Sequence, residues 1–108
     1  MNETVLMEGI ANPIRKSGFV GNGRAALTNK RLVFFKHGIA KTLALGMLVN
    51  LTAGSFEYDI PISAMKDVSI RSHGLGHALI ITCRDHSIYQ YGITEPEKWM
   101  KAFETAIE

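Results

Sequence analysis

The sequence predicts a mainly β domain, an antiparallel barrel or sandwich of about seven strands closed by a C-terminal helix. Three observations support this fold class: short apolar segments between turn-forming residues, one clear hairpin, and a change to helical periodicity at the end of the chain. The 108 residues are close to the commonest domain size. We therefore expect a single domain, 1–108, with one core.

The clearest element is a β-hairpin over 23–35. Its turn, 28–30, separates an apolar run that ends at Leu27 from one that begins at Leu32. Pro61 cannot donate a ladder hydrogen bond, so its strand is predicted to lie at a sheet edge or to end there. The remaining strands are predicted at 5–10, 56–62, 68–71, 78–83 and 88–93, with a long glycine-rich loop over 18–23.

The segment 95–108 is predicted to form an amphipathic helix. Thr94 and Glu97 have the spacing of a capping box, and Pro96 falls in the first turn, where its missing N–H costs nothing. The two aromatic residues of the apolar stripe should cover the open end or seam of the barrel. The stripe has helical spacing and consists of Trp99, Ala102, Phe103, Ala106 and Ile107.

Positive charge is concentrated in the first half of the chain. The net charge is only +2, but 9–56 contains seven basic residues and no acidic residue. Such a distribution favours an anionic partner. We therefore predict a basic face that binds an anionic membrane surface, formed by Arg15, Lys16, Arg24, Lys30 and Arg31.

The segment 39–51 is unusually apolar, with one charge in thirteen residues. It is too short to span a bilayer, which needs about twenty residues. As a helix it would carry Leu48 and Val49 beside one apolar ridge, the candidate interface. Three roles remain open: a crossover that completes the core, self-association, or membrane insertion. The ridge consists of Ile39, Leu43, Met47 and Leu51.

The sequence shows no catalytic signature such as a nucleophile elbow, a phosphate loop or a zinc-protease helix motif. His73 and His77 are four residues apart, but the two glycines between them favour a hairpin turn over a metal site. Cys83 lies in an apolar run and is predicted to be a buried thiol. We expect a non-enzymatic chain without metal or cofactor.

The aromatic pair Phe34 and Phe35 lies between Arg31 and Lys36, a pattern that can stack nucleic-acid bases. Because neighbours on a strand face opposite ways, one ring should belong to the core and one should remain outside. A single ring is a poor stacking platform, so no nucleic-acid partner is expected.

The amino terminus has acidic residues where a secretory signal has basic ones, and it lacks the apolar region of such a signal. We expect a cytoplasmic chain, either free or peripherally attached to a membrane.

Four stretches carry a resemblance to a known family. They are 8–12, 23–35 with Leu-Thr-Asn-Lys-Arg-Leu at its centre, 58–62, and Trp99 in the final helix. Together they resemble bacterial pleckstrin-homology-like domains of the GRAM type over nearly the whole chain. The resemblance implies the barrel fold and a role in binding membranes, phosphoinositides or proteins. The leading hypothesis is peripheral lipid association through the basic face; the alternative is a protein-interaction domain that assembles through 39–51.

Overall fold

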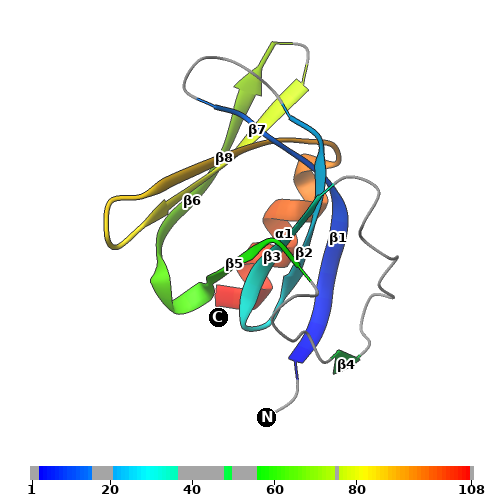
Figure 1. Cartoon of the computed structure of the whole chain (residues 1–108), viewed down its shortest axis with the longest axis vertical. Coiled ribbons are helices and arrows are strands. Elements are labelled where there is room, and N and C mark those ends of the chain that lie inside the picture. The colour runs from blue at the N-terminus through cyan, green and yellow to red at the C-terminus, as the bar shows by residue number, and fades with distance from the viewer. Residues whose placement is uncertain (1–2, 16–20, 37–47, 50–55, 75, 108) are drawn as a thin grey trace.

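The chain forms an eight-stranded antiparallel sheet followed by a C-terminal helix (Figure 1). The computed structural model describes residues 3–15, 21–36, 48–49, 56–74 and 76–107. In chain order the elements are β1 (Glu3–Pro13), β2 (Gly23–Thr28), β3 (Arg31–Lys36), β4 (Leu48–Val49), β5 (Tyr58–Pro61), the 3-10 helix η1 (Ile62–Ala64), β6 (Met65–His73), β7 (Gly76–Cys83), β8 (Ile88–Ile93) and α1 (Pro96–Ile107).

The strands follow the order β5-β3-β2-β1-β8-β7-β6, and β4 pairs with β1 outside this path. The sheet curls around α1 (Figure 1), but no ladder joins β5 to β6 among the described residues. The mainly β class with one closing helix is therefore confirmed, and the sheet stays open between these two edge strands.

The predicted hairpin is confirmed. β2 and β3 pair from Gly23 opposite Lys36 to Leu27 opposite Leu32. Thr28 stabilises the turn, because its hydroxyl oxygen accepts the backbone N–H groups of Lys30 and Arg31, both at 3.1 Å. Glycine is required at position 23, since an added Cβ would lie 2.4 Å from the Phe34 ring.

Three strands, β1, β6 and β7, are longer than predicted. β1 covers eleven residues rather than 5–10, because its first part pairs with β2 and its end pairs with β8. The loop expected around His73 and His77 is a tight turn at Gly74, whose φ of 60° suits glycine. The register places Ser72 opposite His77, so the two imidazoles lie on opposite faces of a hairpin.

The edge prediction for Pro61 is confirmed, because β5 is an edge strand and ends at this residue. The strand is shorter than expected, since it begins at Tyr58 rather than Phe56.

The main core lies inside the curled sheet and includes the helix. Trp99 is fully buried and Phe103 is 1% exposed, so both aromatic residues of the predicted stripe pack as expected. Ile107 does not follow the stripe, because it is 55% exposed. The predicted capping box between Thr94 and Glu97 is wrong, because these two side chains form no hydrogen bonds in the described part of the chain. The helix begins at Pro96, and the Glu95 carbonyl accepts the backbone N–H groups of Lys98 and Trp99.

The opposite face of β2 and β3 is buried as well. Phe34 belongs to the main core, whereas Phe35 packs with Ala26, Val33 and the half-buried Phe56 in a second cluster. The expectation that one of the two phenylalanines stays outside is therefore wrong, because both faces of this part of the sheet are covered.

The segment 39–51 is described only at Leu48 and Val49, which pair with Thr4 and Glu3 as strand β4. At these two positions the chain is extended rather than helical. The candidate interface residues Ile39, Leu43, Met47 and Leu51 lie outside the described residues. Within the described part of the chain, no helix is long and apolar enough to cross a membrane.

Candidate binding groove

A groove of about 930 Å³ lies between the beginning of β6 and the C-terminal half of α1. Lys66 and Asp67 from β6, Arg84 from the β7–β8 turn and Glu104 from α1 contribute charges to its lining. The apolar lining is formed by Ile62, Met65, Val68, Met100, Phe103 and Ile107. The helix therefore presents one face to the core and its neighbouring face to this groove.

β6 borders the groove with an unpaired edge. The strand is nine residues long, and its ladder partner among the described residues is β7 alone. Val68 and Ile70 pack against the main core, so Asp67, Ser69 and Arg71 lie on the other face of the strand. A long edge strand without proline offers backbone N–H and C=O groups for pairing with another chain.

Two charged side chains along this edge are accessible to a binding partner. Asp67 and Arg71 are exposed, and neither has an ion-pair partner in the described ranges. Arg84 is held in place, since its Nε donates to the Ser63 carbonyl at 3.1 Å. The edge of β6 thus combines backbone groups that have no ladder partner among the described residues with one acidic and two basic side chains: Asp67, Lys66 and Arg71.

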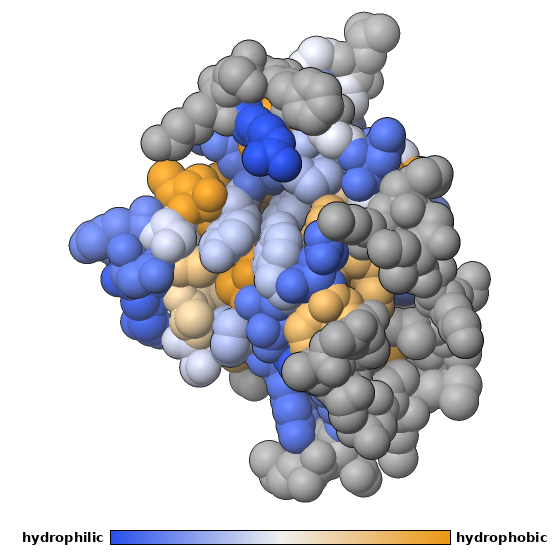
Figure 2. All heavy atoms as spheres, viewed as in Figure 1, coloured by the Kyte–Doolittle hydropathy of each residue, from blue (hydrophilic) through white to orange (hydrophobic). Residues whose placement is uncertain are grey.

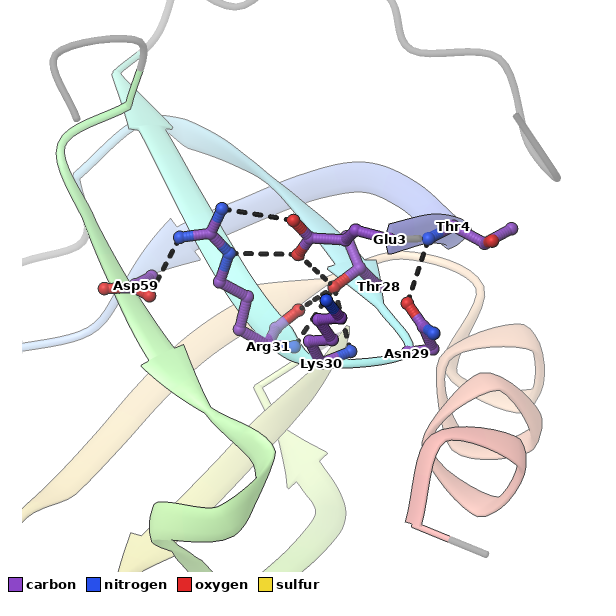
Figure 3. Close-up of polar contacts among 7 residues, drawn as sticks. All are labelled: Glu3, Thr4, Thr28, Asn29, Lys30, Arg31 and Asp59. Atoms are coloured by element: carbon purple, nitrogen blue, oxygen red, sulfur yellow. Dashed lines mark hydrogen bonds and ion pairs between the residues drawn. The ribbon is translucent and has the colours of Figure 1, made fainter. Parts of the chain in front are cut away.

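Arg31, one of the predicted basic residues, forms ion pairs with two carboxylates (Figure 3). Its Nε donates to Glu3 Oε2 at 2.9 Å, its Nη2 donates to Glu3 Oε1 at 3.1 Å, and its Nη1 donates to Asp59 at 3.2 Å. The Thr28 hydroxyl donates to the same Glu3 carboxylate at 2.6 Å. This polar network, made of Glu3, Thr28, Arg31 and Asp59, joins β1, β2, β3 and β5.

The polar network shifts the pKa of both main partners. Burial raises the pKa of Glu3, but the hydrogen bonds from Arg31 and Thr28 outweigh it and leave the pKa below its ordinary value. The hydrogen bond to Glu3 raises the pKa of Arg31. The guanidinium also lies over the Phe56 ring, 5.0 Å from its centroid. Arg31 therefore holds strands together.

The four predicted basic residues that the structure describes do not form one cluster. Lys30 in the β2–β3 turn and Arg31 at the beginning of β3 lie next to Glu3, the first residue of β1. Arg15 follows the other end of β1, and a strand of eleven residues separates its two ends by roughly 30 Å. Arg24 lies between them and pairs with Glu8 at 2.8 Å. Lys16 lies outside the described residues. Arg24 and Arg31, the two predicted arginines that lie within strands, each have a carboxylate partner.

The concave side of the sheet carries a row of stacked aromatic rings. Phe34 stacks on Tyr58 and Tyr91, and Tyr58 stacks on Tyr89. Tyr58 and Tyr91 share a hydrogen bond between their hydroxyls, and burial raises the pKa of both. Figure 2 shows weakly polar and apolar side chains at the centre of this face, with strongly hydrophilic ones around them. Phe34 and Tyr91 belong to the buried core, and the half-buried Tyr58 and Tyr89 pack against it.

Other reactive groups give no site. Cys83 is a free buried thiol, as predicted, and burial raises its pKa. In the described ranges, no three His, Cys, Asp or Glu side chains cluster so that they could hold a metal ion.

The groove residues were not predicted as a site. One sequence signal was present: Met100, Phe103 and Ile107 recur at helical spacing, so the apolar arc of the helix is wider than its core stripe. The free edge of β6 has no comparable signal, because strand order depends on pairings between distant segments.

The fold matches solved structures that carry pleckstrin-homology domains. A crystal structure of human RhoA in complex with the DH/PH fragment of PDZRHOGEF superposes with a TM-score of 0.63 and 20% identity, covering 97% of this chain and 29% of that chain. The ternary complex of human RhoA, its inhibitor and the DH/PH domain of human ARHGEF11 gives 0.62 and 22%, with the same coverages of 97% and 29%.

This chain therefore has a pleckstrin-homology-like fold, and it spans less than a third of the chains that it matches. No family model and no curated protein matches it. The GRAM type suggested by the sequence stays a prediction.

Proposed function

We propose that this chain is a non-catalytic protein-interaction module that binds an extended peptide segment along β6. The observation that carries the proposal is the nine-residue edge strand β6, whose outer side has no ladder partner among the described residues, beside a groove of about 930 Å³. The two similar structures named above contain a DH/PH fragment in complex with another protein, RhoA, which supports a protein-binding role for this fold.

The chemistry of the groove suits an added strand. A peptide next to β6 gains main-chain hydrogen bonds from the free edge, which give affinity without strict sequence requirements. Every second peptide side chain then points toward α1, where Met100 and Ile107 offer apolar surface. Selectivity follows from these alternate positions, because Lys66, Arg84 and Glu104 lie around the same surface.

Selection from a displayed library of random nine-residue peptides tests the proposal. Selected peptides should slow amide hydrogen exchange along β6 and bind at least about tenfold more weakly to Met100→Glu, because a carboxylate enters the apolar wall. Thr105→Glu is the matched control, since it adds the same charge on an exposed helix position outside the groove, and it should change affinity less than about twofold.

The proposal fails if the selected peptides protect amides elsewhere, such as β2 and β3. It also fails if no peptide is selected, or if both variants bind equally well.

A second candidate function is association with an anionic membrane surface at the end of β1. Arg15 is exposed there, has no ion-pair partner in the described ranges, and is followed in sequence by Lys16. Each basic side chain near a charged leaflet contributes about 1 kcal/mol. Co-sedimentation with vesicles containing phosphatidylserine should fall for the double variant Arg15→Ala, Lys16→Ala. Equal sedimentation with neutral and anionic vesicles would reject this function.

Self-association through 39–51 stays a prediction. Leu43→Glu together with Met47→Glu tests it by the mass in solution, which should fall to that of a monomer if these side chains form an interface.

A further inference from the structure

We propose that the strand that pairs with β6 belongs to a second copy of this chain, so that two β6 edges pair antiparallel about Ser69 and form a symmetric dimer. The inference rests on the proposed function, because it names the partner of the same edge. It is carried by the distribution of side chains along β6.

A two-fold axis at Ser69 fixes which residues face one another. Val68 of one copy lies opposite Ile70 of the other, and Asp67 lies opposite Arg71. Directly opposed residues of an antiparallel pair share a face of the sheet. The observed register agrees with this: Asp67 and Arg71 lie opposite Thr82 and Ala78 of β7 on one face. Val68 and Ile70 lie opposite the buried Ile81 and Leu79 on the other.

The charges are self-complementary in this register. The two-fold axis creates two ion pairs between Asp67 and Arg71, one on each side of the centre. Both side chains are exposed and have no ion-pair partner in the described residues. The half-buried Val68 and Ile70, which already contact the main core, would extend apolar packing across the new pair of strands.

Neighbouring registers are less favourable. Moving the axis by one residue, to Val68 or Ile70, places Ser69 opposite one of the charged residues and removes both ion pairs. Moving it by two residues places Asp67 opposite Asp67, or Arg71 opposite Arg71. Like charges directly opposite each other destabilise a strand pair. The charge pattern therefore selects one alignment.

The edge is accessible to a second copy. From Arg71 to His73 the side chains of β6 are exposed, and the turn residue Gly74 is exposed as well. Figure 1 shows the β6–β7 hairpin reaching beyond the body of the sheet.

Sedimentation equilibrium of the full chain tests the dimer. The wild type should dimerise with rising concentration. Asp67→Arg and Arg71→Asp should each raise the dissociation constant at least about tenfold, because each creates two like-charge pairs. An equimolar mixture of the two variants should dimerise again. In the mixed dimer the two substituted side chains face each other with opposite charges, and the native Arg71 of the first variant faces the native Asp67 of the second.

Lys101→Asp is the matched control for Arg71→Asp. It changes the charge equally at an exposed position of α1 and should leave dimerisation unchanged. Cooperative thermal unfolding of each variant by circular dichroism shows that each is folded.

A wild type that stays monomeric up to about 1 mM overturns the dimer, as does a mixture that fails to restore association or a control that weakens it equally. The two proposals are separable. A monomer that still binds selected peptides along β6 overturns the second copy alone, whereas a monomer that binds none overturns both.

Discussion

The two edges of the sheet, β5 and β6, are built differently. β5 has four residues, ends in a proline, and its Asp59 is bonded to Arg31. β6 has nine residues, contains no proline, and carries charges without ion-pair partners in the described residues. Short length and proline are features that protect an edge from unwanted pairing. The contrast indicates that pairing is blocked at β5 and available at β6.

The largest expected loss of stability follows from a substitution in α1, the helix that lines the groove beside β6. Trp99→Ala should lower the free energy of unfolding by about 3–5 kcal/mol, because it leaves a cavity under β1 and α1. Denaturant unfolding followed by circular dichroism measures this. Trp99→Phe should cost clearly less, since the indole N–H has no hydrogen-bond partner among the described residues. A loss as small as that of the exposed Ile107→Ala would contradict the packing.

The second largest loss of stability is expected in the polar network at the β5 edge. Glu3→Ala should lower the free energy of unfolding by about 2 kcal/mol, because Arg31 loses its main partner while it is only 20% exposed. Glu104→Ala on the β6 side removes an exposed carboxylate and should stay within about 0.5 kcal/mol. Chemical denaturation of both variants compares the two sides. Equal losses would show that the polar network does not stabilise the β5 side.

Low pH should destabilise the β5 side of the sheet, because it protonates the Glu3 carboxylate. The folded pKa of Glu3 lies below its unfolded value, so its stabilisation is present above the ordinary glutamate pKa of about 4.3 and is lost as the pH falls through the folded pKa. Thermal unfolding between neutral and strongly acidic pH should show a smaller acid-induced loss in Glu3→Gln than in the wild type. Parallel curves for the two proteins would contradict this assignment.

The smallest effect on stability is expected for the ion pair between β1 and β2, in the middle of the sheet. Arg24 pairs with Glu8, but its side chain is 37% exposed, and such pairs typically contribute less than about 1 kcal/mol. A double-mutant cycle with Arg24→Ala and Glu8→Ala should give a coupling energy below that value. A coupling as large as the loss in Glu3→Ala would place Arg24 among the residues that hold the sheet together.

The elements that depend on local patterns were predictable. The hairpin turn at 28–30 and the helical stripe with Trp99 and Phe103 depend on residues that lie close together in the sequence, and both are confirmed. Arg31 shows what is missing from such patterns. It counts as a surface cation in the sequence, yet its partners Glu3 and Asp59 each lie 28 residues away along the chain. Non-local pairing converts a predicted binding residue into a structural one.

The second cluster and the groove escaped prediction for a related reason. Alternation along a strand predicts two faces but not whether both are covered, so the burial of Phe35 with Val33 was not foreseen. The free edge of β6 follows only from the strand order, which no short stretch of sequence contains. The basic residues were identified by type alone, and the structure separates Arg31 from Arg15 by the length of β1.

The pairing of β1 with β8 has a consequence for the time course of folding. Ala11 lies opposite Ile93, so the N-terminal strand obtains this partner only when the last strand has been synthesised. On a ribosome, the β2–β3 hairpin can form early, but the end of β1 must wait for most of the chain. Contacts between such distant segments slow folding, and an unpaired strand end is prone to aggregate during the delay. Truncation before β8 should therefore yield an insoluble chain.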